Sequence, residues 1–122
     1  MLRLQIHGRI RHRPAYAEER GHLIRTVHAL AVGPDDLRGR LPRVYPLLSR
    51  IRTADLPAVL RDDFLWVIAQ LTKRPPRYRG RPAAWETIVD ARVAAMRVAT
   101  RQKVAQRIVY LSERLRTIAA SE

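Results

Sequence analysis

Apolar residues recur every three or four positions along most of the chain, which is the period of one face of an α-helix. The first such stretch, 15–32, follows Pro14 and ends before Gly33. Its first turn carries two acids, Glu18 and Glu19, where the helix dipole favours negative charge. Proline favours a helix start and glycine favours a helix end, so we predict a first helix over 15–32.

The second stretch opens at Asp35–Asp36 and keeps a helical period as far as Ile51. It also contains Pro42 and Pro46. Each proline removes a main-chain donor, so we expect either a kink or two short helices in this stretch.

A third helix is predicted at roughly 56–72, with Asp55 as its N-cap. Three residues, Val59, Leu65 and Trp66, extend its apolar face nearly all round. A helix this apolar is usually central to a domain or half of an interface. These three residues are therefore candidate contacts with another subunit or with a second copy of the chain. The alternative is that they complete a small core.

The last helical region starts at Pro82 and contains a break. Its apolar positions share one face from Trp85 to Ala99 and another from Val104 to Ile118, rotated by about 100° on one straight helix. A kink or a new helix is therefore expected near Thr100, which gives four to five helices. We find no internal repeat, so residues 1–122 are predicted to form a single all-α domain, a compact bundle.

The first 13 residues do not follow the helical period. Leu2, Leu4 and Ile6 alternate with polar residues, as in a strand, yet a helical chain offers a single strand no partner. We expect an extended or flexible basic arm, which pairs with another chain or orders on a ligand. The candidate nucleic-acid-binding residues of this arm are Arg9, Arg11 and Arg13.

Composition adds a strong positive charge, because 24 Lys and Arg against 11 Asp and Glu give a net charge of +13. Like charges repel one another in the compact state, and such an excess is usually matched by a polyanion. All the cations except Lys73 and Lys103 are arginines. Arginine binds phosphate bidentately and stacks on bases, although a GC-rich genome produces the same preference.

The densest charge lies in "KRPPRYRGRP", residues 73–82. Prolines hold such a segment open, while its cations follow phosphates and its aromatic ring stacks on an unpaired base. We therefore predict a nucleic-acid-binding loop; the alternative is a solvated connector between helices. The candidate residues of the loop are Lys73, Arg74, Arg77, Tyr78, Arg79 and Arg81.

The final helix carries another candidate surface, because Lys103, Arg107 and Arg114 fall on one face, away from the apolar stripe. Glu113 is the only acid in 91–121, so the usual ion pairing along a helix is largely missing. This face is predicted to bind a polyanion or to be an ordinary exposed surface.

Sequence patterns for catalysis or metal binding are missing. No two histidines have the spacing of a helical metal pair, and neighbouring acids such as Asp62 and Asp63 diverge by about 100° on a helix. The chain has no cysteine and no glycine-rich phosphate loop. We therefore expect no enzyme activity, cofactor or metal. No apolar run resembles a membrane span or signal peptide, so a cytoplasmic location is expected.

The Arg-rich loop "KRPPRYRGRP" and the basic last helix "RVATRQKVAQRIVYLSERLR" give the chain an overall character. In this character it resembles the small helical subunit of multi-subunit (class 1) CRISPR effector complexes. The resemblance includes no diagnostic motif. It implies a non-catalytic subunit that lies beside other protein subunits and lines the path of guide or target strands.

Two other functions stay open. A sequence-specific DNA-binding regulator would use a recognition helix, for which "TRQKVAQR" at 100–107 is the candidate. A small RNase or toxin would need histidines and arginines that the fold brings together. The histidines are His7, His12, His22 and His28.

Overall fold

The structure is a computed structural model that describes residues 15–32, 36–73 and 85–122. Within these ranges the chain forms five α-helices, one 3-10 turn and no strand, so the predicted all-α bundle is confirmed. The elements are α2 (Ala17–Val32), α3 (Leu37–Leu48), η1 (Thr53–Asp55), α4 (Ala58–Thr72), α5 (Trp85–Ala95) and α6 (Val98–Ala120).

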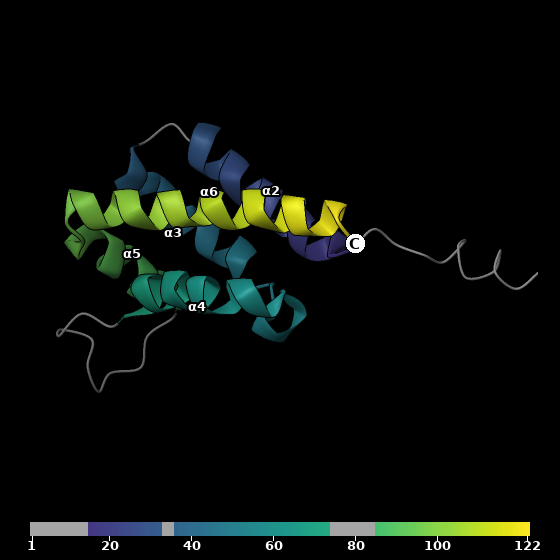
Figure 1. Cartoon of the computed structure of the whole chain (residues 1–122). Helices are drawn as coiled ribbons and strands as arrows, with labels where there is room; N and C mark the ends of the chain where they lie inside the picture. Colours follow the sequence, from purple (N-terminus) through teal and green to yellow (C-terminus); the bar gives the residue numbers. More distant parts are fainter. Residues whose placement is uncertain (1–14, 33–35, 74–84) are drawn as a thin grey trace, which may run out of the picture.

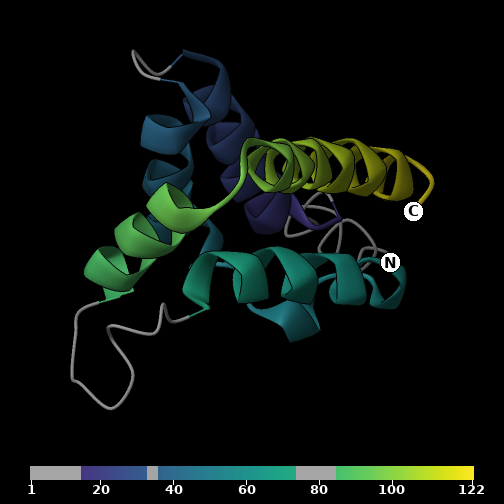
Figure 2. The same cartoon turned by 90° about the vertical axis from the view of Figure 1, so that its left-hand side faces the viewer.

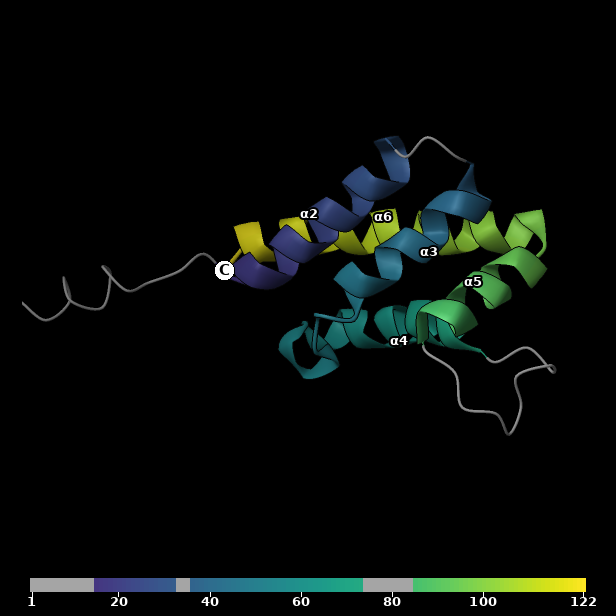
Figure 3. The same cartoon turned by 180° about the vertical axis from the view of Figure 1, so that it is seen from behind.

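The long helix α6 organises the bundle and contacts α2, α3 and α4 (Figure 1). In the view of Figure 1, α2 crosses behind α6 so that only its end rises above it, and α4 lies below α6. Figure 2, which views α6 obliquely, and Figure 3, which shows the bundle from behind, place α3 and α5 on one side of the bundle, between α2 and α4. Every helix therefore turns one face towards a shared interior.

That interior is a single apolar cluster, to which all five helices contribute. The stripe predicted for the last helix supplies Val104, Ile108, Leu111 and Leu115, each at most 1% exposed. Burying four such side chains stabilises the fold by roughly 1.5–3 kcal/mol each, before the entropy of ordering them is counted. The periodicity of α6 therefore identified its buried face correctly.

The two prolines of the second stretch lie inside one continuous helix, α3. Of the two predicted alternatives, a kink or two short helices, the second is therefore wrong. The side chain of Asp36 caps the helix by accepting a hydrogen bond from the main-chain N–H of Arg38, at 3.0 Å. The Leu41, Val44 and Leu48 face is fully buried, and this burial offsets the main-chain hydrogen bonds that the prolines remove.

The start of α4 also differs from the prediction, because Asp55 belongs to η1 and is not the N-cap of α4. Pro57 stands at the N-cap position instead and gives no side-chain cap hydrogen bond. A residue before proline is kept out of the α region, and Leu56 is accordingly extended, with φ −93° and ψ 154°. The helix therefore begins after the Leu56–Pro57 pair.

The break predicted near Thr100 is confirmed, slightly earlier in the chain. α5 ends at Ala95 and α6 begins at Val98, with Arg97 extended between them at ψ 153°. This change of direction explains why the apolar stripe rotates along the last helical region. It also leaves the final carbonyl groups of α5 without partners in their own helix.

Candidate nucleic-acid interface

Most of the residues predicted to bind nucleic acid lie outside the described ranges. These are Arg9, Arg11 and Arg13 of the arm and Arg74, Arg77, Tyr78, Arg79 and Arg81 of the loop. The described part of the chain includes Lys73 from the loop segment, which is exposed at the C-cap of α4. The described part of the candidate interface therefore consists of Lys73 and the predicted cations of α6.

Lys103, Arg107 and Arg114 form the surface that we call the basic stripe of α6. Helical spacing places all three on one side of the helix, and Arg107 shows that this side faces α4. Lys103 is exposed and Arg114 is half-buried. Neither of these two has a hydrogen bond or ion pair within the described residues. Their charges therefore remain available to a ligand.

Arg107 is held more firmly than the other two. Its Nη1 donates to Oδ1 of Asp63 on α4, and its guanidinium carbon lies 4.9 Å from the ring centroid of Trp66. The two charged side chains are 38% and 29% exposed, so water screens the pair and its contribution is about 1 kcal/mol or less. Asp63 thus neutralises one of the three cations and fixes its position in the seam between α4 and α6.

Several arginines outside the basic stripe donate to main-chain carbonyl groups, a use that sequence reasoning missed. The last carbonyls of a helix have no partner in that helix and carry partial negative charge. Arg101 fills this role for α5, with Nε 3.0 Å from the oxygen of Val93 and Nη2 3.2 Å from that of Ala94. Arg40 similarly donates to the oxygen of Leu30, near the end of α2.

Arg92 and Arg61 make the same kind of contact. Arg92 joins α5 to the end of α4, because its Nε and Nη2 each lie 2.8 Å from an oxygen of Gln70, one in the main chain and one in the side chain. Arg61 donates to the oxygens of Leu56 and Ala54, beside the 3-10 turn. A carbonyl has no formal charge. Arginines bound to carbonyls therefore still count fully in the net charge, and the sequence does not reveal that they have partners.

The three candidate interface residues of α4 do not form one patch. Val59 is 65% exposed and lies on the same side of the helix as Trp66, which packs against the core beneath Arg107. Leu65 is 49% exposed and lines a different hollow of about 220 Å³, together with Tyr45 and Phe64. Leu65 therefore lies on a different surface of α4 from Val59 and Trp66.

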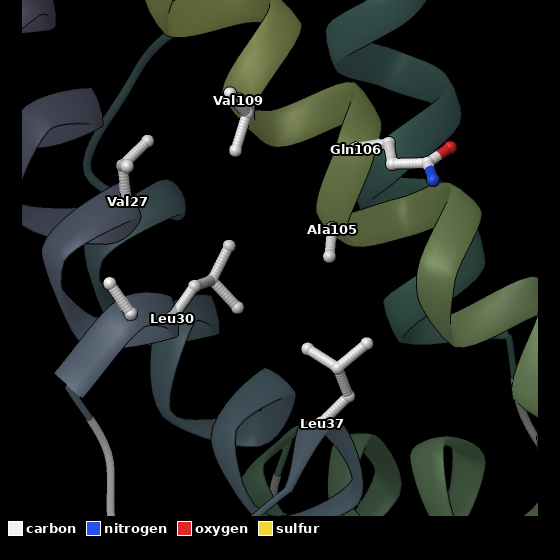
Figure 4. A pocket seen from close by; sticks show the side chains of 7 residues that line it. Val27, Leu30, Leu37, Ala105, Gln106 and Val109 are labelled. Carbon is white, nitrogen blue, oxygen red and sulfur yellow. The ribbon is translucent and has the colours of Figure 1, made fainter.

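A larger apolar pocket, of about 410 Å³, opens between α2, the start of α3 and α6. Figure 4 shows Val27, Leu30, Leu37 and Val109 directed into this space, whereas the amide of Gln106 turns away from it. The lining offers no charged group and no nucleophile. Sequence reasoning did not find this pocket, because its residues come from three separate helices.

Few groups in the described ranges suggest catalytic chemistry. His28 is exposed, and Nδ1 of His22 lies 2.8 Å from Nη2 of Arg25, which donates to it. Asp62 faces solvent while Asp63 binds Arg107, so these neighbouring acids diverge as expected. Across 15–32, 36–73 and 85–122, no three His, Cys, Asp or Glu residues are grouped closely enough to hold a metal ion.

Further observations concern the recognition segment, the membrane and the comparison with known proteins. In the candidate recognition segment 100–107, Arg101 donates to a main-chain carbonyl of α5 and Arg107 pairs with Asp63 of α4. Among the described helices, none combines the length and the apolar character that crossing a membrane requires. Searches against protein-family models, curated proteins and solved structures found no match to this chain.

Proposed function

We propose that this chain is a non-catalytic protein that binds the phosphate backbone of nucleic acid, as one subunit of a larger ribonucleoprotein assembly. The observation that carries the proposal is the uncompensated charge of the basic stripe. Lys103 and Arg114 lie on one side of α6 with no acidic partner in the described structure. The net charge of +13 adds attraction for any polyanion at longer range.

Binding is expected to be insensitive to base sequence. Contacts to phosphate position a protein on nucleic acid but carry no sequence information of their own. The arginines of the candidate recognition segment 100–107, Arg101 and Arg107, instead contact α5 and α4. This favours a backbone-binding subunit over a sequence-specific regulator.

The positive charge also supports a role inside an assembly. Copies that each carry +13 repel one another, and a nucleic-acid strand that neutralises them removes this repulsion. Other protein subunits, or further copies of this chain, would then lie side by side along the strand. The small subunit of a CRISPR effector complex, which the sequence resembles in overall character, is one such setting.

The test is fluorescence polarisation with labelled mixed-sequence RNA and DNA over a range of salt concentrations. We expect tight binding at low salt and an affinity that falls steeply as salt rises, by about 0.7 logarithmic units per tenfold salt for each phosphate contacted on a single strand. Unlabelled strands of unrelated sequence should compete equally well.

Three results would contradict the proposal. Absence of binding at low salt would remove the nucleic-acid function altogether. Competition by one DNA sequence alone would favour the regulator. Cleavage of the labelled RNA, lost in His22→Ala or His28→Ala while binding remains, would favour the RNase.

A further inference from the structure

Tyr110 stands in the middle of the basic stripe and has no evident structural task. Of the tyrosines in the described ranges, Tyr16 and Tyr45 pack against the core, whereas Tyr110 is 44% exposed. Its hydroxyl and its ring make no hydrogen bond or ring contact within those ranges. An aromatic side chain that is nearly half exposed on a helix surface is accessible to a ligand.

The position of Tyr110 among the cations is set by helical geometry. It lies about 4.5 Å along the helix axis from Arg107 and about 6 Å from Arg114, on the same side of α6. Asp63 and Trp66 restrain Arg107 beside it. The ring is therefore flanked by a fixed arginine on one side and by an unpaired arginine on the other.

This combination of an exposed ring between cations matches the chemistry of an unpaired nucleotide. Base faces stack on aromatic side chains, while the phosphates on either side of the base meet the cations. A duplex keeps its base faces inside the stack, and taking one base out costs a few kcal/mol. Tyr110 can therefore add affinity for a single strand but little for a duplex.

We infer that the basic stripe is a single-strand site in which an unpaired base stacks on Tyr110 while Lys103 and Arg114 hold phosphates of the same strand. The inference rests on the proposed function and narrows its ligand to unpaired RNA or DNA. The sequence-predicted stacking residue, Tyr78, lies outside the described ranges, so Tyr110 is a distinct contact.

The test compares Tyr110→Ala and Tyr110→Phe with the unchanged protein, using mixed-sequence single-stranded RNA, single-stranded DNA and duplex DNA in polarisation assays. Tyr110→Ala should weaken single-strand binding roughly tenfold and leave duplex binding unchanged. Tyr110→Phe should retain the affinity, because the ring and not the hydroxyl stacks. The slope of affinity against salt should stay the same in both variants, since no charge is removed.

Val98→Ala is the matched control, because Val98 is a 63% exposed apolar residue on the opposite side of the same helix. Its substitution should change no affinity. Equal binding of single strands and duplex, with no effect of Tyr110→Ala on either, would overturn the single-strand site and leave backbone binding intact. Failure of every probe to bind at low salt would instead overturn the proposed function itself.

Discussion

At the scale of single residues, arginines either stabilise the fold or present positive charge without a partner in the described structure. Arg40, Arg61, Arg92 and Arg101 donate to main-chain carbonyls, whereas Lys103 and Arg114 have no hydrogen bond or ion pair in the described structure. The planar guanidinium suits hydrogen bonding to carbonyls because it offers two donors at a fixed spacing. The arginine content therefore reflects the fold as well as any ligand.

Replacement of Arg92 tests this structural role. Arg92→Met keeps much of the apolar stem but leaves both oxygens of Gln70 without their donor, so the free energy of unfolding should fall by about 1–3 kcal/mol. Arg92→Lys should lose less, because an ammonium group can still reach one of the oxygens. Urea denaturation measures both. Arg97→Met removes an exposed arginine and should stay within about 0.5 kcal/mol of the unchanged protein.

The contacts of Arg107 between α4 and α6 can be tested in the same way. Arg107→Ala removes an ion pair and a cation–π contact, each partly screened by water, and should destabilise the protein by about 1 kcal/mol. Part of that loss should disappear at high salt, which screens the ion pair. Lys103→Ala, at an exposed position without a partner, serves as the control. Equal losses in both variants would show that the seam contributes nothing specific.

At the scale of elements, proline decides where the helices depart from their sequence period. Pro57 forces Leu56 into an extended conformation, which moved the start of α4 past the predicted N-cap Asp55. Pro42 and Pro46 did not divide α3, because its other face is buried in the core. The conformational limits of proline therefore set where a helix begins, whereas burial of the apolar face keeps a helix continuous across internal prolines.

Pro46→Ala should therefore stabilise the protein. Pro46 is exposed inside α3, so alanine restores a main-chain donor without removing core contacts. The gain should be roughly 1–3 kcal/mol, reduced by the greater freedom that alanine gives the unfolded chain. Thermal or urea unfolding measures it. Pro57→Ala, at a helix start where no intrahelical bond is missing, should bring no gain; an equal gain there would contradict this explanation.

Two leucines of α4 test which of its faces is buried. Leu60 is completely buried, and Leu60→Ala should cost about 2–5 kcal/mol. Leu65 is 49% exposed, and Leu65→Ala should cost less than about 1 kcal/mol. Urea denaturation measures the free energy of unfolding of both variants, which carry the same leucine-to-alanine change on one helix. Similar large losses for both would show that α4 is buried on every side, as its composition alone suggested.

At the scale of the whole molecule, the sequence revealed the bundle better than the site. Burial imposes a helical period on apolar residues, so the helices and the core stripe of α6 were predictable. The contacts of Arg92 with Gln70 and of Arg107 with Asp63 join residues far apart in the sequence. Tyr110 and the pocket beside Val109 likewise depend on how the helices pack. No pattern within one helix reveals such pairs.

The measurement that tests backbone binding most directly is the salt dependence of single-strand affinity in two matched double variants. Lys103→Ala with Arg114→Ala removes two cations from the basic stripe. Arg97→Ala with Arg116→Ala removes two exposed cations outside the stripe, one at the N-cap of α6 and one near its end. The first variant should lower the salt slope by about 1.4, and the second should leave it nearly unchanged. Equal slopes in the two variants, or an unchanged slope in the first, would contradict binding at the basic stripe.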